Sequence, residues 1–265
     1  MQVRQRTIES GNIQELLHFN NAITIQENKS NNPFGRNGTG EWLPPEEQEK
    51  KEQDNRDKTL KRNISKLWRL YNCNKGQYNH KDKFLTLTFR ILPDTLEAAD
   101  YELKKFLKKL KYYSKTKIEH LGVRELQMLY EREGIHYHII IFNMPYIPHK
   151  LLLKMWCKNN SYMDAKKPSG VNIKGIRDGY EEMTNYLTSY QLKDLVDNDF
   201  IKGHKTLLKS RGLIKPTTTN YCNEKYLPEL EDIKKGLSFM ENRITYYRLN
   251  DKPADKYIIT QFGLK

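Results

Sequence analysis

The chain has no long apolar run. Its longest unbroken aliphatic stretch, Ile139 to Ile141, falls far short of the roughly 20 residues that a membrane-spanning helix needs. The first residues, MQVRQRTIES, also lack the apolar stretch of a secretory signal. The sequence therefore excludes an integral membrane protein, and we expect a protein of the cytoplasm with no membrane partner.

Cysteine is scarce as well. Cys73, Cys157 and Cys222 are an odd set, far apart, without the paired CxxC spacing of a structural zinc site. We expect three unbridged thiols. The sequence also lacks an internal repeat and a GxxxxGK[ST] phosphate loop, which argues against an ATP-driven motor within this chain.

Basic residues are abundant. Among 265 residues, 46 Lys and Arg stand against 33 Asp and Glu, which leaves a formal net charge of +13. Hydrophobic residues make up 37%, enough for one core of ordinary size, while a mean hydropathy of −0.85 places much of the length in water. A positive surplus spread along the chain favours a polyanionic partner, nucleic acid before a membrane surface.

Composition divides the chain into three parts. Residues 1–57 are polar and are broken by NNPFGRNGTG and two prolines, so we expect an N-terminal extension. Residues 58–216 carry the regular patterns of a folded domain. Residues 217–265 are expected to be a C-terminal tail, in which RITYYRL and KYIITQF are candidates for one further hairpin.

The periodicity of the middle part predicts an α+β fold. Helices are predicted where apolar residues recur every three or four positions: Thr59–Tyr71, Thr95–Tyr113, Leu151–Lys158 and Tyr180–Leu195. Strands are predicted at 84–89 (FLTLTF), 120–129, 135–142 and, as an edge strand, 171–176 (VNIKGI). We expect a mostly antiparallel sheet of about five strands, with 135–142 central and helices over one face.

Two histidines stand out. His136 and His138, two apart on a strand, project from one face about 6–7 Å apart at the backbone, close enough for both imidazoles to meet one divalent ion. Glu125 and Gln127 lie on the preceding strand of the same hairpin, and one of their oxygens is expected to complete the set. Ordinary packing explains many HxH pairs, and a register one residue different would turn the acid to solvent.

Two tyrosines form the second feature. Tyr186 and Tyr190 are four apart and share one face of the predicted helix, with Lys193 one turn beyond. A phenol becomes a useful nucleophile if a metal polarises the phosphorus centre and a nearby cation steadies the developing charge. The alternative is that both tyrosines are ordinary core or interface residues.

In the order FLTLTF, Glu125, HYHIIIF and YxxxYxxK, over some 110 residues, the chain resembles the HUH endonucleases that initiate rolling-circle replication. The helix before FLTLTF, the strand KIEHLGVRELQ, and SRGLIKP extend the resemblance over about residues 58–216, to the replication-associated proteins of the filamentous-phage gene II group. The resemblance implies an RRM-like core and a metal-dependent strand nicking and rejoining enzyme.

By position, the resemblance assigns Mg²⁺ or Mn²⁺ to His136, His138 and Glu125, with Gln127 as a rival third ligand. It makes Tyr190 the nucleophile, Tyr186 its partner and Lys193 the nearby cation. The implied partners are single-stranded origin DNA, a host helicase and a polymerase. Many relatives have Lys before the second tyrosine, where this chain has Ser189.

Other functions are compatible with the same residues. A tyrosine transposase or a relaxase is built from the same parts, although relaxases commonly use a third histidine where this chain offers Glu125. A nucleic-acid-binding module that has lost catalysis, and a structural protein with an unused HxH pair, are the alternatives outside that class. The basic stretches 103–111 and 202–211 are candidate phosphate contacts, or simply solvated surface.

Overall fold

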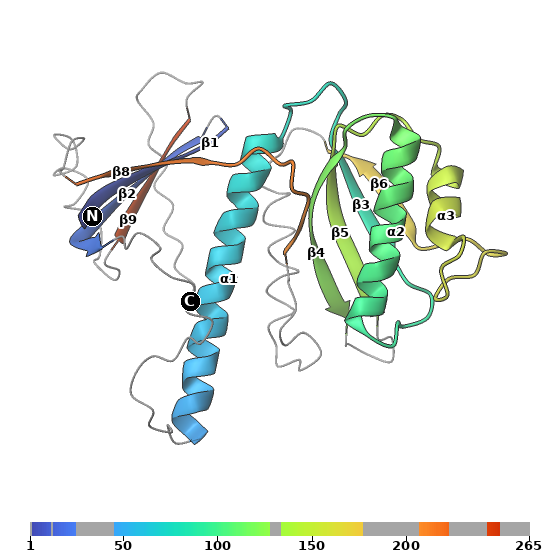
Figure 1. Cartoon of the computed structure of the whole chain (residues 1–265), viewed down its shortest axis with the longest axis horizontal. Coiled ribbons are helices and arrows are strands. Elements are labelled where there is room, and N and C mark those ends of the chain that lie inside the picture. Colours follow the sequence, from blue (N-terminus) through green and yellow to red (C-terminus); the bar gives the residue numbers. More distant parts are fainter. Residues whose placement is uncertain are drawn as a thin grey trace. The chain divides into compact units, whose positions relative to one another are not determined.

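The protein is described from a computed structural model, which covers residues 2–11, 13–24, 45–127, 134–176, 207–222 and 243–249. The chain divides into two compact units. One combines residues 1–48 with 215–265, and the other spans 49–214. Each unit is described by itself (Figure 1).

The 49–214 unit contains a five-stranded sheet in the order β6-β3-β5-β4-β7. All neighbours are antiparallel. The strands are β3 (Lys83–Thr88), β4 (Glu119–Gln127), β5 (Gly134–Phe142), β6 (Val171–Gly175) and β7 (Leu207–Lys209). The predicted α+β class is confirmed, with the HxH strand in the centre and the VNIKGI segment at an edge.

Two helices cover one face of this sheet. They are α2 (Leu96–Ser114) and α3 (His149–Cys157), close to their predicted bounds. Thr95 caps α2 by accepting a hydrogen bond from the Ala98 backbone N–H at 3.2 Å. The main core forms between them and the sheet, with fully buried side chains that include Leu85, Ile139 and Trp156.

A third helix lies on the other face. Helix α1 (Pro45–Asn74) begins well before the predicted Thr59, and its last turns place Leu67 and Tyr71 against Phe84 and Ile140. Figure 1 shows α1 on one side of the sheet and α2 and α3 on the other. The expectation of helices over a single face was wrong, because even-numbered positions of β5 are apolar at its Phe142 end and need a cover too.

The other unit contains a four-stranded antiparallel sheet in the order β8-β1-β2-β9. Its strands are β1 (Gln2–Ser10), β2 (Ile13–Thr24), β8 (Thr217–Tyr221) and β9 (Arg243–Leu249). The sequence analysis treats the two ends of the chain as separate segments, whereas the structure joins them through these pairings. RITYYRL is indeed a strand, but it pairs with β2, and KYIITQF lies outside the described residues.

The three cysteines are free thiols, as expected; Cys73 and Cys157 are buried and Cys222 is exposed. Within the described ranges, no helix has both the length and the apolar character required to cross a membrane.

Candidate functional site

Strand register brings the candidate metal ligands to one face of the sheet. Glu125 on β4 lies directly opposite His136 on β5, and His138 lies opposite Val123. On the other side of β5, Thr88 is opposite His136 and Thr86 is opposite His138. Because side chains alternate along a strand, all these residues project to the face that α1 covers at its far end.

Glu125 and His138 are in direct contact. The Glu125 Oε2 and His138 Nε2 atoms are 2.8 Å apart, and both side chains are largely buried. Two ligand atoms in cis positions around an ion with bonds of about 2.1 Å are about 3 Å apart. The pair is therefore spaced as two ligands of one small divalent cation would be, with a shared proton between the atoms in place of the cation.

His136 is oriented differently. Its Nδ1 lies 2.9 Å from the Thr88 hydroxyl, and its Nε2 lies above Gly134. The two imidazoles are nearly parallel, with ring centroids 6.4 Å apart. Burial lowers the pKa of His136, and His138 lowers it further against the opposing effect of Glu125, so the neutral imidazole that a metal requires is favoured.

Among the described residues, no three His, Cys, Asp or Glu side chains are grouped closely enough to hold a metal ion. The structure thus unites His138 with Glu125 and leaves His136 turned toward Thr88. Gln127, the rival third ligand, faces Gly134 at the end of β4, and its side chain lies outside the described set. In the Nδ1–H tautomer, His136 donates to Thr88 Oγ1 and its Nε2 lone pair is available.

The tyrosine helix lies outside the described residues. Tyr186, Tyr190 and Lys193 all fall in 177–206, the segment that joins β6 to β7. These two strands are the opposite edges of the sheet. The placement of the three side chains therefore stays a prediction.

A buried ion pair lies behind the histidines. Arg124 and Tyr137 are cross-strand partners on the reverse face, next in sequence to Glu125 and to both histidines. Asp100 of α2 accepts a hydrogen bond from Arg124 Nη2 at 2.6 Å and from the Tyr137 hydroxyl at 2.8 Å. Burial alone would lower the pKa of Arg124, but Asp100 and Tyr137 raise it above its ordinary value.

The sequence analysis missed this ion pair, although a signal for it exists. Alternation along 119–127 places Arg124 on the helix-covered face, where a charge requires a partner. A helix two strands away cannot be identified as the source of that partner from periodicity.

Thr88, the neighbour of His136, is itself fixed by the loop after α3. Its backbone N–H donates to Gly170 O at 2.8 Å, and its carbonyl accepts from Trp156 Nε1–H at 3.0 Å. Gly170 has φ +78°, and a Cβ there would lie 2.2 Å from Thr88 O. Only glycine permits this approach.

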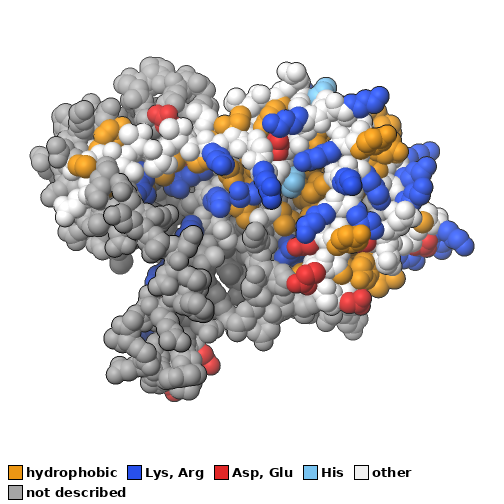
Figure 2. Space-filling model, in the orientation of Figure 1, with side chains coloured by type: hydrophobic (Ala, Val, Ile, Leu, Met, Phe, Trp, Pro, Cys, Tyr) orange, Lys and Arg blue, Asp and Glu red, His pale blue; other side chains and the backbone are white. Residues whose placement is uncertain are grey.

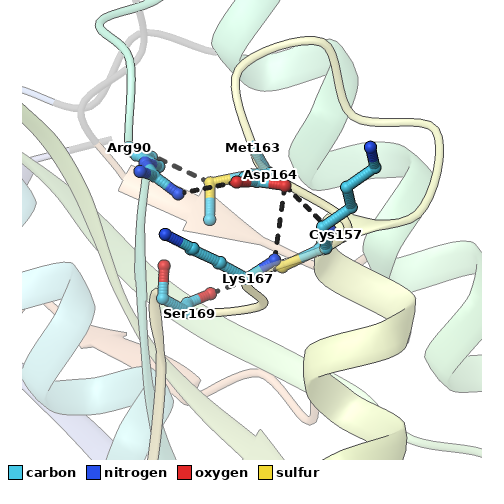
Figure 3. Close-up of polar contacts among 7 residues, drawn as sticks. Arg90, Cys157, Met163, Asp164, Lys167 and Ser169 are labelled. Atoms are coloured by element: carbon cyan, nitrogen blue, oxygen red, sulfur yellow. Dashed lines mark hydrogen bonds and ion pairs between the residues drawn. The ribbon is translucent and has the colours of Figure 1, made fainter.

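Figure 3 shows the same loop from the side of Arg90. Asp164 forms an ion pair with Arg90 at 3.0 Å, and Cys157 Sγ–H donates to Ser169 O at 3.5 Å. Contacts at both ends of the loop therefore hold it against α3 and the end of β3.

The lysines of α2 are of two kinds. Lys109 Nζ donates to the carbonyls of Met155 and Lys158 at 2.8 Å, and Lys105 Nζ donates to that of Asn159. These two ammonium groups bind the carbonyls at the end of α3, as cations at a helix C-terminus do. The exposed lysines of the predicted phosphate-contact stretch are Lys104, Lys108 and Lys111. Figure 2 shows basic side chains spread over the face that carries α2.

A family model covers the histidine hairpin. Residues 82–195 match the model of a replication-associated protein family, that of the ORF2 and phage gene II proteins. The match spans less than half of the chain and includes Glu125, both histidines and both tyrosines. It supports a phage or plasmid replication initiator group and a role in replication initiation that involves DNA.

The search of curated proteins gives no match. Among solved structures, the chain is similar to the crystal structure of the hypothetical protein ORF119 from Sulfolobus islandicus rod-shaped virus 1. The TM-score is 0.34 at 15% sequence identity, over 51% of this chain and 99% of that one.

Proposed function

We propose that the protein is an HUH-type initiator of rolling-circle replication, which nicks and rejoins single-stranded origin DNA through a 5′-phosphotyrosine. The observation that carries the proposal is the contact of Glu125 with His138 beside His136, on one face of the central hairpin. This hairpin lies inside the segment that matches the replication-associated family. Ordinary packing does not require a carboxylate and two imidazoles on an otherwise apolar strand pair.

The donor set suits a small divalent cation, Mg²⁺ or Mn²⁺. Glu125, His138 and His136 would hold it, once the His136 ring turns from Gly134 toward its cross-strand partner Glu125. Cross-strand side chains have Cβ atoms about 4.5–5.5 Å apart, so this motion is a side-chain rotation without a change of register. When bound, the cation supplies Lewis-acid polarisation of the scissile phosphate.

Tyr190 is the proposed nucleophile. Its phenol loses a proton and attacks phosphorus; the bond to the 3′ oxygen breaks, and that oxygen leaves as a hydroxyl for a polymerase to extend. Tyr186 would make the second attack that closes the displaced strand, and Lys193 would steady the phenolate. A host helicase would separate the strands, because the phosphotyrosine link conserves bond energy without unwinding DNA.

The described strands are compatible with this placement. Residues 177–206 join the two edges of the sheet, which are about 19 Å apart across four strand spacings. The predicted helix Tyr180–Leu195 would be about 24 Å long, enough for that crossing. β7 begins at Leu207, opposite Val123 and therefore level with His138.

The proposal is tested by incubating the purified protein and Mn²⁺ with single-stranded DNA tiled across its own replicon. We expect cleavage of one tile, abolished by EDTA and by His138→Gln. Lys104→Gln, on the helix that covers the opposite face, is the matched control and should cleave normally. Binding without cleavage of any tile would refute the proposal and favour an inert DNA-binding module.

A further inference from the structure

We propose that Arg90, Lys166 and Lys167, here called the Arg90 cluster, bind the phosphate backbone of single-stranded DNA beside the histidine face. The inference rests on the proposed function and adds to it a track for the strand. The basic stretches considered in the sequence analysis do not include these three residues.

The cluster lies where β3 ends, close to His136. Thr88 is the last residue of β3 and contacts His136 at 2.9 Å; Arg90 follows two residues later, within about 7 Å along the chain. The Arg90 backbone N–H donates to Tyr162 O at 3.3 Å and also contacts Met163 Sδ at 3.2 Å. These contacts fix the cluster at the histidine end of the sheet.

Asp164 organises the three cations. One carboxylate oxygen accepts from Arg90 Nη1 at 3.0 Å, and the other accepts from the backbone N–H groups of Lys166 at 2.8 Å and Lys167 at 3.3 Å. In Figure 3 Asp164 lies between Arg90 and the turn that carries Lys167. A single carboxylate therefore presents three cations together, and the local charge stays positive.

The cations are accessible to a ligand. Arg90 remains 46% exposed in its ion pair, and Lys166 and Lys167 are exposed. Within the described ranges, no acidic side chain forms an ion pair with either lysine. This differs from Lys105 and Lys109 of α2, whose ammonium groups bind carbonyl oxygens.

Apolar surface next to the cluster favours a single strand. Ile91 and Leu92 directly follow Arg90 and are 59% and 37% exposed. The Ile91 backbone N–H donates to Tyr162 O at 3.2 Å, so the segment is held in place. Unpaired bases can cover such surface while the cations contact phosphates, whereas a duplex keeps its bases stacked inside.

The test measures binding of a fluorescein-labelled oligothymidine in EDTA, by anisotropy at several salt concentrations. Each phosphate contact to a single strand contributes about −0.7 to the slope of log K against log salt. Arg90→Gln/Lys166→Gln/Lys167→Gln should reduce the magnitude of the slope by about 2 and weaken binding at low salt at least fivefold. The matched control, Lys104→Gln/Lys108→Gln/Lys111→Gln, removes the same charge from α2 and should keep the slope.

A triple variant whose slope stays within about 0.5 of wild type would overturn the inference, as would an equal loss in the control. Lys166→Gln/Lys167→Gln leaves the Arg90–Asp164 pair intact and should still lower the slope by about 1.4. An equal loss on duplex DNA would refute the assignment to single strands.

The two proposals fail separately. If wild type binds the oligonucleotide but cleaves no replicon tile with Mn²⁺, the nicking proposal fails and the binding result stands. If wild type cleaves and the triple variant binds like wild type, the assignment of the Arg90 cluster fails alone.

Discussion

The buried pair behind the histidines predicts an unusually large cost for a conservative substitution. Asp100→Asn keeps the shape of the side chain and removes its charge, so Arg124, only 2% exposed, loses its counter-ion. Breaking a buried pair from one side costs about 3–5 kcal/mol. Because the Asp100 side chain is 25% exposed, we expect the lower end, about 3 kcal/mol.

The exposed pair of Arg90 and Asp164 is the matched control. Its contact is 3.0 Å, but the side chains are 46% and 36% exposed, and Asp164→Asn can still accept the two backbone hydrogen bonds. We expect a loss of at most about 1 kcal/mol. Urea unfolding of both variants and wild type measures the difference at constant m. Equal costs for the two substitutions would refute the view that Asp100 neutralises a buried charge.

Three further predictions concern the loop, the pH response and the histidine face. Gly170→Ala should lose about 3 kcal/mol of unfolding free energy, because its Cβ would lie 2.2 Å from Thr88 O; Gly76→Ala, at φ +64° with no atom within 4 Å, should lose only about 1 kcal/mol, and equal losses in urea would contradict the clash. Burial lowers the pKa of His120 to about 4, so below pH 6.5 the unfolded chain binds a proton that the folded chain does not. Stability should therefore fall by about 2 kcal/mol between pH 7 and 5 from this residue, and His120→Gln should remove that part of the fall; an unchanged pH profile would refute it. Thr88→Val removes the hydroxyl that orients His136 and should weaken Mn²⁺ binding about 10- to 100-fold in calorimetry, while an unchanged affinity would exclude that role.

Elements with strong periodicity were predictable from the sequence. FLTLTF predicts a strand at 84–89 and the structure has Lys83–Thr88; the lysine-rich pattern predicts a helix at Thr95–Tyr113 and the structure has Leu96–Ser114. The alternation in HYHIIIF also predicts that both histidines share a face with Glu125, which the register confirms. Such patterns are local consequences of a buried face, so a short window contains them.

Contacts between distant segments were not predictable in this way. β1 pairs with β8, some 210 residues later in the chain, and no window of polar sequence indicates that partner. The capping of α3 by Lys105 and Lys109 has the same origin, since charge on a helix surface indicates solvent until the neighbouring carbonyls are placed. The turn of His136 toward Thr88 depends on side-chain rotation, which strand alternation leaves open.

The central claim is that a tyrosine of this chain becomes covalently joined to a cleaved DNA strand. The most direct measurement is mass spectrometry of the adduct formed with a cleaved single-stranded tile and Mn²⁺, comparing wild type with Tyr190→Phe, Tyr186→Phe and the double variant. We predict a 5′-phosphate adduct on Tyr190 in wild type, and no adduct in the double variant. Cleavage that persists in the double variant, without any protein–DNA link, would contradict the account.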